Sequence, residues 1–299
     1  MEAETTPRDP PDDVKRLVRQ RCGFGCVECG APIYHYDHMF DFAEVRRHRP
    51  EEITLLCPNR HDEKSRGRLP LELVQQWNAS PFNARAKMSK PHPLHYFGNA
   101  CEFVLGSNTV FNRMGEGNAL FRALTIDGRP LLGFRFEQGR LLLNLAIYDH
   151  KDQPLFLVED GELTYRTDQW DIEWVGQTLT VRNGRRKPIV EIRFAVPDQV
   201  IVRRARFRMN GIEYCIEPTF AVLTNRGDIH VDVHLEDVWS AVSMGDDAQS
   251  AGPAALVLTE LNRSVPPSVR EENVKHARRE AASYLRARNL GDGPAGSGS

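Results

Sequence analysis

The sequence predicts an α+β protein with a small cysteine-rich N-terminal domain, a larger all-β domain and a C-terminal helix. Four of the six cysteines lie in the first fifth of the chain, and strand-length apolar segments alternate with turn signals further on. A stretch near the C-terminus has the pattern of a capped helix. The expected boundaries are an N-terminal domain at 12–80, a linker at 81–96, the all-β domain at 97–240, a linker at 241–265, the helix at 266–290 and a flexible tail at 291–299.

The composition excludes some classes of protein. The chain has 299 residues and a net charge of −2, so any affinity for nucleic acid must come from local basic patches rather than from the whole surface. No apolar run approaches the length of a membrane span, and the N-terminus lacks the features of a signal peptide. We therefore expect a cytoplasmic protein with no membrane partner. In that compartment clustered cysteines indicate metal binding rather than disulfides.

Two helices are expected in the N-terminal domain. Asp12 can cap a short helix over 13–21, and a second helix is expected from about Pro70 to Asn78, where apolar residues recur at helical spacing. The stretch that follows is rich in proline and basic residues, which is typical of a linker and places the first domain boundary there.

The all-β prediction depends on short units that each consist of a strand, a tight turn and a strand. Such units lie around 141–158, 179–194 and 205–217, and their spacing favours a sandwich, a barrel or a solenoid. Ser268 and Glu271 form a capping box that opens the C-terminal helix. A homo-oligomer formed through the β domain or through this helix is a further expectation.

The residues that carry chemistry lie in two segments of the N-terminal domain. Cys26 and Cys29 have knuckle spacing, which lets both thiolates reach one Zn²⁺, and a second knuckle normally completes the tetrahedral site. Asp37 and His38 follow on an expected strand. The second segment reads Thr-Leu-Leu-Cys-Pro-Asn-Arg-His-Asp-Glu-Lys over 54–64 and enters a helix.

This combination resembles the HNH, or ββα-metal, endonuclease family. Asp37-His38 on a strand, followed by the Leu-Leu-Cys segment with His61 on a helix, is similar to the family's core motif. Cys-Gly-Phe-Gly-Cys-Val-Glu-Cys-Gly over 22–30 resembles a bacterial group of such proteins. The similarity covers about 60 residues, at 22–78, and implies a small ββα-metal domain in a metal-dependent enzyme that hydrolyses nucleic-acid phosphodiesters.

The resemblance also implies roles for three residues. His38 would be the general base, and Asp37 and His61 would hold a catalytic Mg²⁺ or Mn²⁺. An imidazole suits the deprotonation of water near neutral pH, and a hard cation neutralises charge that develops on the phosphate. Because adjacent strand residues point to opposite faces, Asp37 and His38 would need a bent hairpin to aim at one point.

The sequence departs from the family pattern at two positions. Glu52 stands where the family has its middle asparagine, and it could ligate a metal or brace the loop. Arg60 stands where the fourth zinc ligand is expected, and arginine cannot ligate. We favour a structural zinc on Cys26, Cys29 and Cys57. The alternatives for the fourth ligand are Cys22, His35 and His48, or a degenerate site that holds no zinc.

The expected partner is nucleic acid, with DNA favoured over RNA. Lys64, Arg66 and Arg68 follow His61 and could contact phosphates, although an ordinary solvated helix face is equally consistent with their spacing. The β domain would then supply oligomerisation, regulation or target binding. Host defence is a role suggested by analogy alone.

The main alternative is a zinc-stabilised module that binds nucleic acid or protein without cutting and carries a β-rich assembly domain. Glu52 and Arg60 support this alternative, because each replaces a residue of the family pattern. A third hypothesis makes the chain mainly a β-structured assembly protein.

Overall fold

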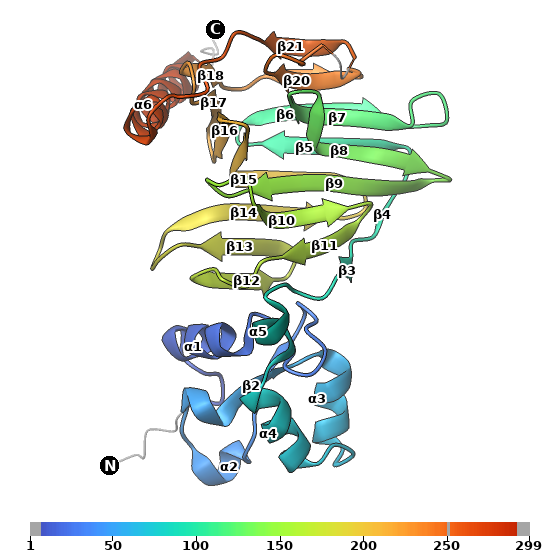
Figure 1. The fold of residues 1–299 in the computed structure, drawn as a ribbon, viewed down its shortest axis with the longest axis vertical. Helices are drawn as coiled ribbons and strands as arrows, with labels where there is room; N and C mark the ends of the chain where they lie inside the picture. Colours follow the sequence, from blue (N-terminus) through green and yellow to red (C-terminus); the bar gives the residue numbers. More distant parts are fainter. Residues whose placement is uncertain (1–6, 250–251, 292–299) are drawn as a thin grey trace, which may run out of the picture. The chain divides into compact units, whose positions relative to one another are not determined.

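The computed structural model describes residues 7–249 and 252–291 as a mixed α+β protein that consists mostly of strands and ends in a helix (Figure 1). The chain divides into two compact units. The first contains Met1–Leu94 and Glu162–Ile189, and the second contains His95–Gly161 and Val190–Ser299. Among the helices in the described ranges, none is long and apolar enough to cross a membrane.

The first unit begins with helix α1 (Asp12–Cys22), one residue longer at each end than expected. The helix ends where Gly23 adopts a left-handed conformation with φ of +68°. Its apolar face buries Val18 and Cys22 in a small core against Ile53 and Val74. The helix therefore depends on burial of one face, as its sequence pattern indicates.

A two-stranded antiparallel sheet lies at the centre of this unit. Short helices lie between its two strands in the sequence and after them. In chain order the elements are β1 (His35–His38), α2 (Phe42–Val45), η1 (Pro50–Glu52), β2 (Ile53–Leu56), α3 (Pro58–Ser65), α4 (Leu71–Ala79) and α5 (Phe82–Ala86). In the β1–β2 register His38 lies opposite Ile53 and Asp37 opposite Thr54. Helix α3 follows β2 after one residue, and α2 and η1 lie between β1 and β2.

The expected linker at 81–96 is instead structured. It contains α5, β3 (His92–Pro93) and the first residue of β4 (Tyr96–Phe97). Asn83 of α5 is fully buried and donates to the carbonyl oxygens of Gly23 (3.0 Å) and Gly30 (3.2 Å). Neither carbonyl belongs to a helix or a strand that would provide a hydrogen-bond donor, so the side chain of Asn83 provides one. A polar segment with the composition of a linker therefore has a structural role.

The expected all-β domain at 97–240 is interrupted, because Glu162–Ile189 belongs to the first unit. There β11 (Glu162–Tyr165) pairs with β3, and β12 (Asp171–Val175) pairs with β13 (Thr178–Arg182). The Arg19 guanidinium forms a bidentate pair with the Asp171 carboxylate, with two N–O distances of 2.8 Å, and both side chains are almost completely buried. This contact spans 152 residues, so local patterns could not have predicted it.

The second unit consists mainly of two sets of hydrogen-bonded strands. Their members are β4, β5 (Ala100–Leu105), β6 (Asn108–Arg113), β7 (Leu120–Ile126), β8 (Arg129–Glu137), β9 (Arg140–Tyr148), β10 (Pro154–Glu159), β14 (Pro188–Ala195), β15 (Gln199–Met209), β16 (Ile212–Glu217), β17 (Phe220–Leu223), β18 (Asp228–His230), β19 (His234–Glu236), β20 (Ser240–Met244) and β21 (Ala254–Leu258). One set runs in the order β21-β20-β7-β8-β9-β10, with β4 beside β9, and the other in the order β14-β15-β16-β17-β18. In the second set β5 pairs with both β15 and β6, and β6 also pairs with β19.

Aromatic rings join the two sets of strands. Phe103 of β5 stacks on Phe134 of β8 with ring centroids 5.1 Å apart, and Phe156 of β10 lies parallel to Phe194 of β14 at 6.4 Å. Because each pair takes one ring from each set, the sheets pack against each other through a shared apolar layer, as in a sandwich.

The expected linker at 241–265 also contains strands. β20 pairs in parallel with both β7 and β21, and the Ser243 hydroxyl lies 2.7 Å from the Thr125 hydroxyl. β20 reads Ser-Ala-Val-Ser-Met, and its small side chains resemble a loop composition. These residues form a strand because they pair with a strand on each side, which local propensity does not reveal.

The C-terminal helix α6 (Pro267–Gly291) agrees with the helix expected at 266–290. Val274, Ala277 and Ala281 pack against an apolar patch that includes Cys215 and Val222, and Figure 1 shows α6 beside β17 and β18. Gly291, the first residue of the expected flexible tail, is the last helical residue, and 292–299 lie outside the described residues.

A buried histidine in the second unit makes stability depend on pH. Burial lowers the pKa of the His230 imidazole, an effect partly opposed by Asp228, and its Nδ1 lies 2.7 Å from the Tyr214 hydroxyl. The pKa of histidine in the unfolded chain is about 6.5. Below that pH the unfolded chain binds a proton more readily than the folded protein does, so the free energy of unfolding falls as the pH drops.

We expect the difference in Tm between pH 7.5 and pH 5 to be smaller in His230→Gln than in the wild type. The exposed His150→Gln is the control, and an unchanged difference in His230→Gln would contradict the prediction.

Candidate functional site

Strand β2 positions the knuckle loop. The Val27 amide donates to the Leu55 carbonyl at 2.9 Å, which ties the loop to the strand. Within the loop, the Cys26 amide donates to Ala31 and the Gly30 amide donates back to the Cys26 carbonyl. A Cβ at Gly30, where φ is +75°, would lie 2.4 Å from the Asn83 side chain, so the tight loop requires glycine there.

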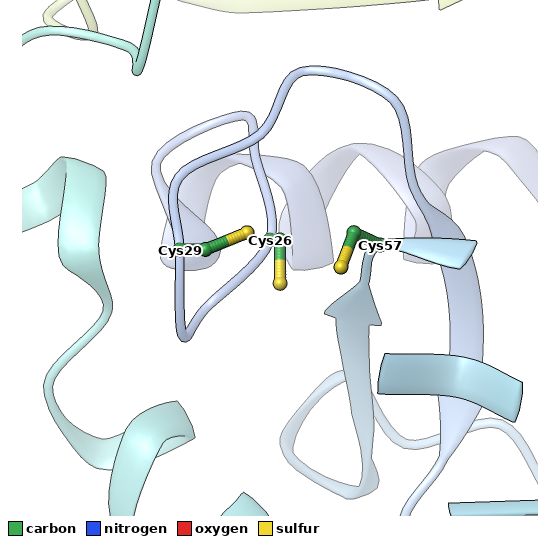
Figure 2. Close-up of side chains that lie close together, drawn as sticks. All are labelled: Cys26, Cys29 and Cys57. Carbon is green, nitrogen blue, oxygen red and sulfur yellow. The ribbon is translucent and has the colours of Figure 1, made fainter. Parts of the chain in front are cut away.

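The loop and the end of β2 bring three thiols together. The sulfur atoms of Cys26, Cys29 and Cys57 all lie within 4.8 Å of one another (Figure 2). Thiolates that share a tetrahedral Zn²⁺ lie about 3.8 Å apart, given a Zn–S distance of about 2.3 Å. The group can therefore bind a metal such as zinc, and the expected three-cysteine ligand set is present as a cluster.

The local hydrogen bonds favour a thiolate in this cluster. The Cys29 thiol donates to the Cys26 sulfur, which lowers the pKa of Cys26 to about 6. The same bond and partial burial raise the pKa of Cys29, and burial raises that of Cys57. A soft divalent cation would replace the remaining thiol protons, so its binding would release protons and weaken at low pH.

The Arg60 guanidinium is paired with two carboxylates. Its guanidinium contacts the Glu28 carboxylate at 3.1 and 3.2 Å and the Glu63 carboxylate at 2.7 Å. These partners raise the pKa of Arg60 further above its ordinary value, so the side chain stays charged. An anchored cation beside a thiolate cluster contributes charge compensation but no ligand.

The three proposed substitutes for the fourth ligand lie elsewhere. In the described part of the chain, no further cysteine, histidine or carboxylate joins the group of three. Cys22 is buried in the apolar core, where its thiol lies 3.9 Å from the Asn78 side-chain oxygen. His35 packs beside His61 with ring centroids 4.9 Å apart, and His48 lies beside His38.

Metal analysis can test this assignment. We expect about one zinc per chain in the wild type and almost none in Cys26→Ser, because two thiolates hold zinc poorly. Cys22→Ser should keep its zinc, since this buried cysteine is not part of the cluster. Elemental analysis of the purified proteins measures both. Loss of zinc in Cys22→Ser, or its retention in Cys26→Ser, would contradict the ligand set.

Arg60 offers a second test of the same site. We expect Arg60→Cys to retain zinc against a competing chelator for longer than the wild type, because a fourth thiolate would complete the tetrahedron. Arg60→Ala, which also frees Glu28 and Glu63 but adds no ligand, is the matched control. Equal chelator resistance in the two variants would show that position 60 does not face the ion.

A second cluster lies in an open cleft of about 980 Å³ beside the same strands. Asp37 of β1 and His61 of α3 line it, and the Asp37 Oδ1 lies 3.7 Å from the His61 Nε2. The Asp37 side chain is only 8% exposed, whereas that of His61 is 37% exposed. The arrangement thus presents one buried carboxylate and one accessible imidazole to the same space.

Lys64 occupies the inner side of this cleft. Its ammonium donates to the His38 carbonyl at 2.7 Å and forms an ion pair with the Asp37 Oδ2 at 2.8 Å. At this distance the ammonium and the carboxylate form a charge-assisted pair. Lys64 therefore faces Asp37, whereas the other predicted phosphate contacts, Arg66 and Arg68, are exposed and both pair with Asp62.

His38 lines the same cleft as Asp37. It is the last residue of β1 and lies opposite Ile53 of β2. Partial burial, and next the neighbouring His48, lower the pKa of the His38 imidazole. The geometry places a histidine with a preference for its neutral form next to Asp37.

Glu52 braces the loop that precedes β2. Its carboxylate pairs with the Arg47 guanidinium at 2.5 and 3.0 Å, which lowers the pKa of the carboxyl group. The Glu52 carbonyl also accepts from the Met39 amide at 2.8 Å. Of the two expected roles, ligation and bracing, the contacts correspond to bracing.

Comparison of the chain with family models, with curated proteins and with solved structures finds no match. The candidate site is therefore defined by its own residues and their contacts. Sequence reasoning missed the contact of His48 with His38 and the pairing of Arg47 with Glu52. Both lie in the basic run Arg-Arg-His-Arg at 46–49, which has the composition of an exposed loop and gives no local signal of such contacts.

Proposed function

We propose that this protein is a metal-dependent endonuclease of the HNH type that hydrolyses nucleic-acid phosphodiesters, with DNA as the favoured substrate. The observation that carries the proposal is the convergence of Asp37, His38 and His61 in one open cleft. Strand β1 supplies Asp37 and His38, helix α3 supplies His61, and a three-cysteine cluster lies beside the end of β2, which connects to α3.

Asp37 and His61 are suited to hold a hard divalent cation such as Mg²⁺ or Mn²⁺. The Asp37 Oδ1 lies close enough to the His61 Nε2 for both atoms to share one ion. The other carboxylate oxygen, Oδ2, is paired with the Lys64 ammonium. The bound cation would neutralise charge that develops on the phosphate and the leaving oxygen.

His38 is suited to act as the general base. Its depressed pKa keeps the imidazole neutral near neutral pH, so it can accept a proton from a water molecule that attacks the phosphorus. Lys64, held between Asp37 and the His38 carbonyl, adds a positive charge that favours a phosphate in the cleft. The cleft is open, as a polymeric substrate requires.

A second candidate function is a zinc-stabilised module that binds nucleic acid or protein and does not cut. Arg60 and Glu52 favour it. Arg60 stands where the family pattern has a zinc ligand and Glu52 where it has an asparagine, and each forms ion pairs instead. In that case the β-rich unit would serve assembly, and the cysteine cluster would stabilise the binding module. Oligomerisation, regulation and host defence are compatible with either function.

A cleavage assay separates the two functions. We expect the wild type to nick plasmid DNA with Mg²⁺ or Mn²⁺, and His38→Ala to lose about 10²- to 10⁴-fold in rate, the usual contribution of a general base. His150→Ala, at an exposed histidine of the second unit, should cut at the wild-type rate. Metal content and melting temperature of the variants show whether folding is preserved.

Two results would refute the endonuclease proposal. Nicking that survives His38→Ala would remove the proposed base. No cleavage of DNA or RNA under any of the metals, by a protein that is folded and holds its zinc, would favour the binding module.

A further inference from the structure

His48 is linked to the proposed base by a chain of hydrogen bonds. It lies between α2 and η1, and its Nδ1 is 3.1 Å from the Nε2 of His38. Its other ring nitrogen, Nε2, is 2.8 Å from the carbonyl oxygen of Pro7. The three groups form a line that runs from the backbone through His48 to His38.

The backbone carbonyl at one end determines the proton positions along this line. A carbonyl oxygen only accepts, so the Nε2 of His48 must carry a hydrogen. In a neutral imidazole the other nitrogen is then an acceptor, so the Nδ1 of His48 accepts from His38. It follows that the Nε2 of neutral His38 carries the hydrogen, and that its Nδ1 keeps the free lone pair.

We propose that His48 is a positioning residue for the endonuclease reaction. It holds His38 in the tautomer in which Nδ1 has no hydrogen, so that this nitrogen can receive the proton of the attacking water. This inference rests on the proposed function. His48 does not touch the substrate or the metal in this scheme. It fixes which nitrogen of the base is free and in which direction that nitrogen points, as an orienting partner does for other catalytic histidines.

Phe42 holds the two imidazole rings in their planes. Its ring stacks on His48, with centroids 5.0 Å apart and an interplanar angle of 15°, and it packs against His38 at 4.8 Å. The rings of His38 and His48 lie 5.3 Å apart. Contacts on the ring faces and hydrogen bonds at the ring edges together restrict the rotation of both side chains.

Glu52 connects the His48 loop to the end of β1. Arg47, next to His48 in the chain, pairs with the Glu52 carboxylate, while the Glu52 carbonyl accepts from the amide of Met39, the residue after His38. The loop that carries His48 is thereby tied to the strand end that carries His38. The glutamate at the family's asparagine position thus has a specific use in this chain.

Two substitutions of His48 separate positioning from packing. In His48→Asn the amide oxygen stands close to the place of Nδ1 and can still accept from His38. In His48→Leu the volume is similar but no acceptor remains. With plasmid DNA and Mg²⁺ or Mn²⁺ we expect His48→Leu to lower kcat about 10- to 100-fold with little change in KM, and His48→Asn to retain most of the activity.

The tautomer itself is measured at pH 8 by NMR on protein labelled with ¹⁵N in histidine. Long-range ¹H–¹⁵N correlations should show the Nε2–H form of His38 in the wild type and in His48→Asn, and a mixture of forms in His48→Leu. The spectrum of His38→Gln assigns the signals. His150→Gln should leave them unchanged.

The proposal is overturned if wild-type His38 carries its hydrogen on Nδ1, if His48→Leu cuts at the wild-type rate, or if it loses activity while the His38 tautomer stays the same. Equal loss in His48→Asn and His48→Leu would also overturn it. The NMR result does not require cleavage. A wild type that cuts nothing would refute the endonuclease and the catalytic part of this inference, while the NMR spectrum still decides the tautomer.

Discussion

The pairing of β1 with β2 is the constraint on which both clusters of the first unit depend. β2 is four residues long and completely buried, so the core holds it in place. One of its edges pairs with β1 and thereby places Asp37, while the Leu55 carbonyl accepts from Val27 and thereby holds the knuckle loop. Cys57 follows the strand directly and His61 lies four residues further on. A shift of one residue in this pairing would reverse the faces of Asp37 and His38.

Two charged residues beside the candidate sites have a common physical form. The charge of each is satisfied by a partner inside the same unit. Arg60 pairs with Glu28 and Glu63, and Glu52 pairs with Arg47. Pairs of this kind hold loops in defined positions, although partly exposed ion pairs contribute little to stability by themselves. Both residues therefore act on the shape of the site.

The first unit is completed by residues far along the chain. Arg19 and Asp171 are buried as a bidentate pair, and Arg19 also donates to Tyr36 and Glu173. A buried charge is tolerated only when its partners are in place, so α1 and β12 need each other. Tyr165 adds a second long-range contact, since its hydroxyl donates to the Phe24 carbonyl at the start of the knuckle loop. The unit that carries the candidate sites is thus formed from two separate segments.

The sequence by itself determined the features that depend on short spacing. The Cys26–Cys29 knuckle, the α1 and α6 helices and the dominance of strands after residue 97 follow from local patterns. Only the tertiary structure decided that Asn83 closes the knuckle loop, that β20 is a strand, that 162–189 joins the first unit and that His48 faces His38. Each of these depends on partners brought together by strand register and loop path, and such contacts leave no periodic signal in the chain.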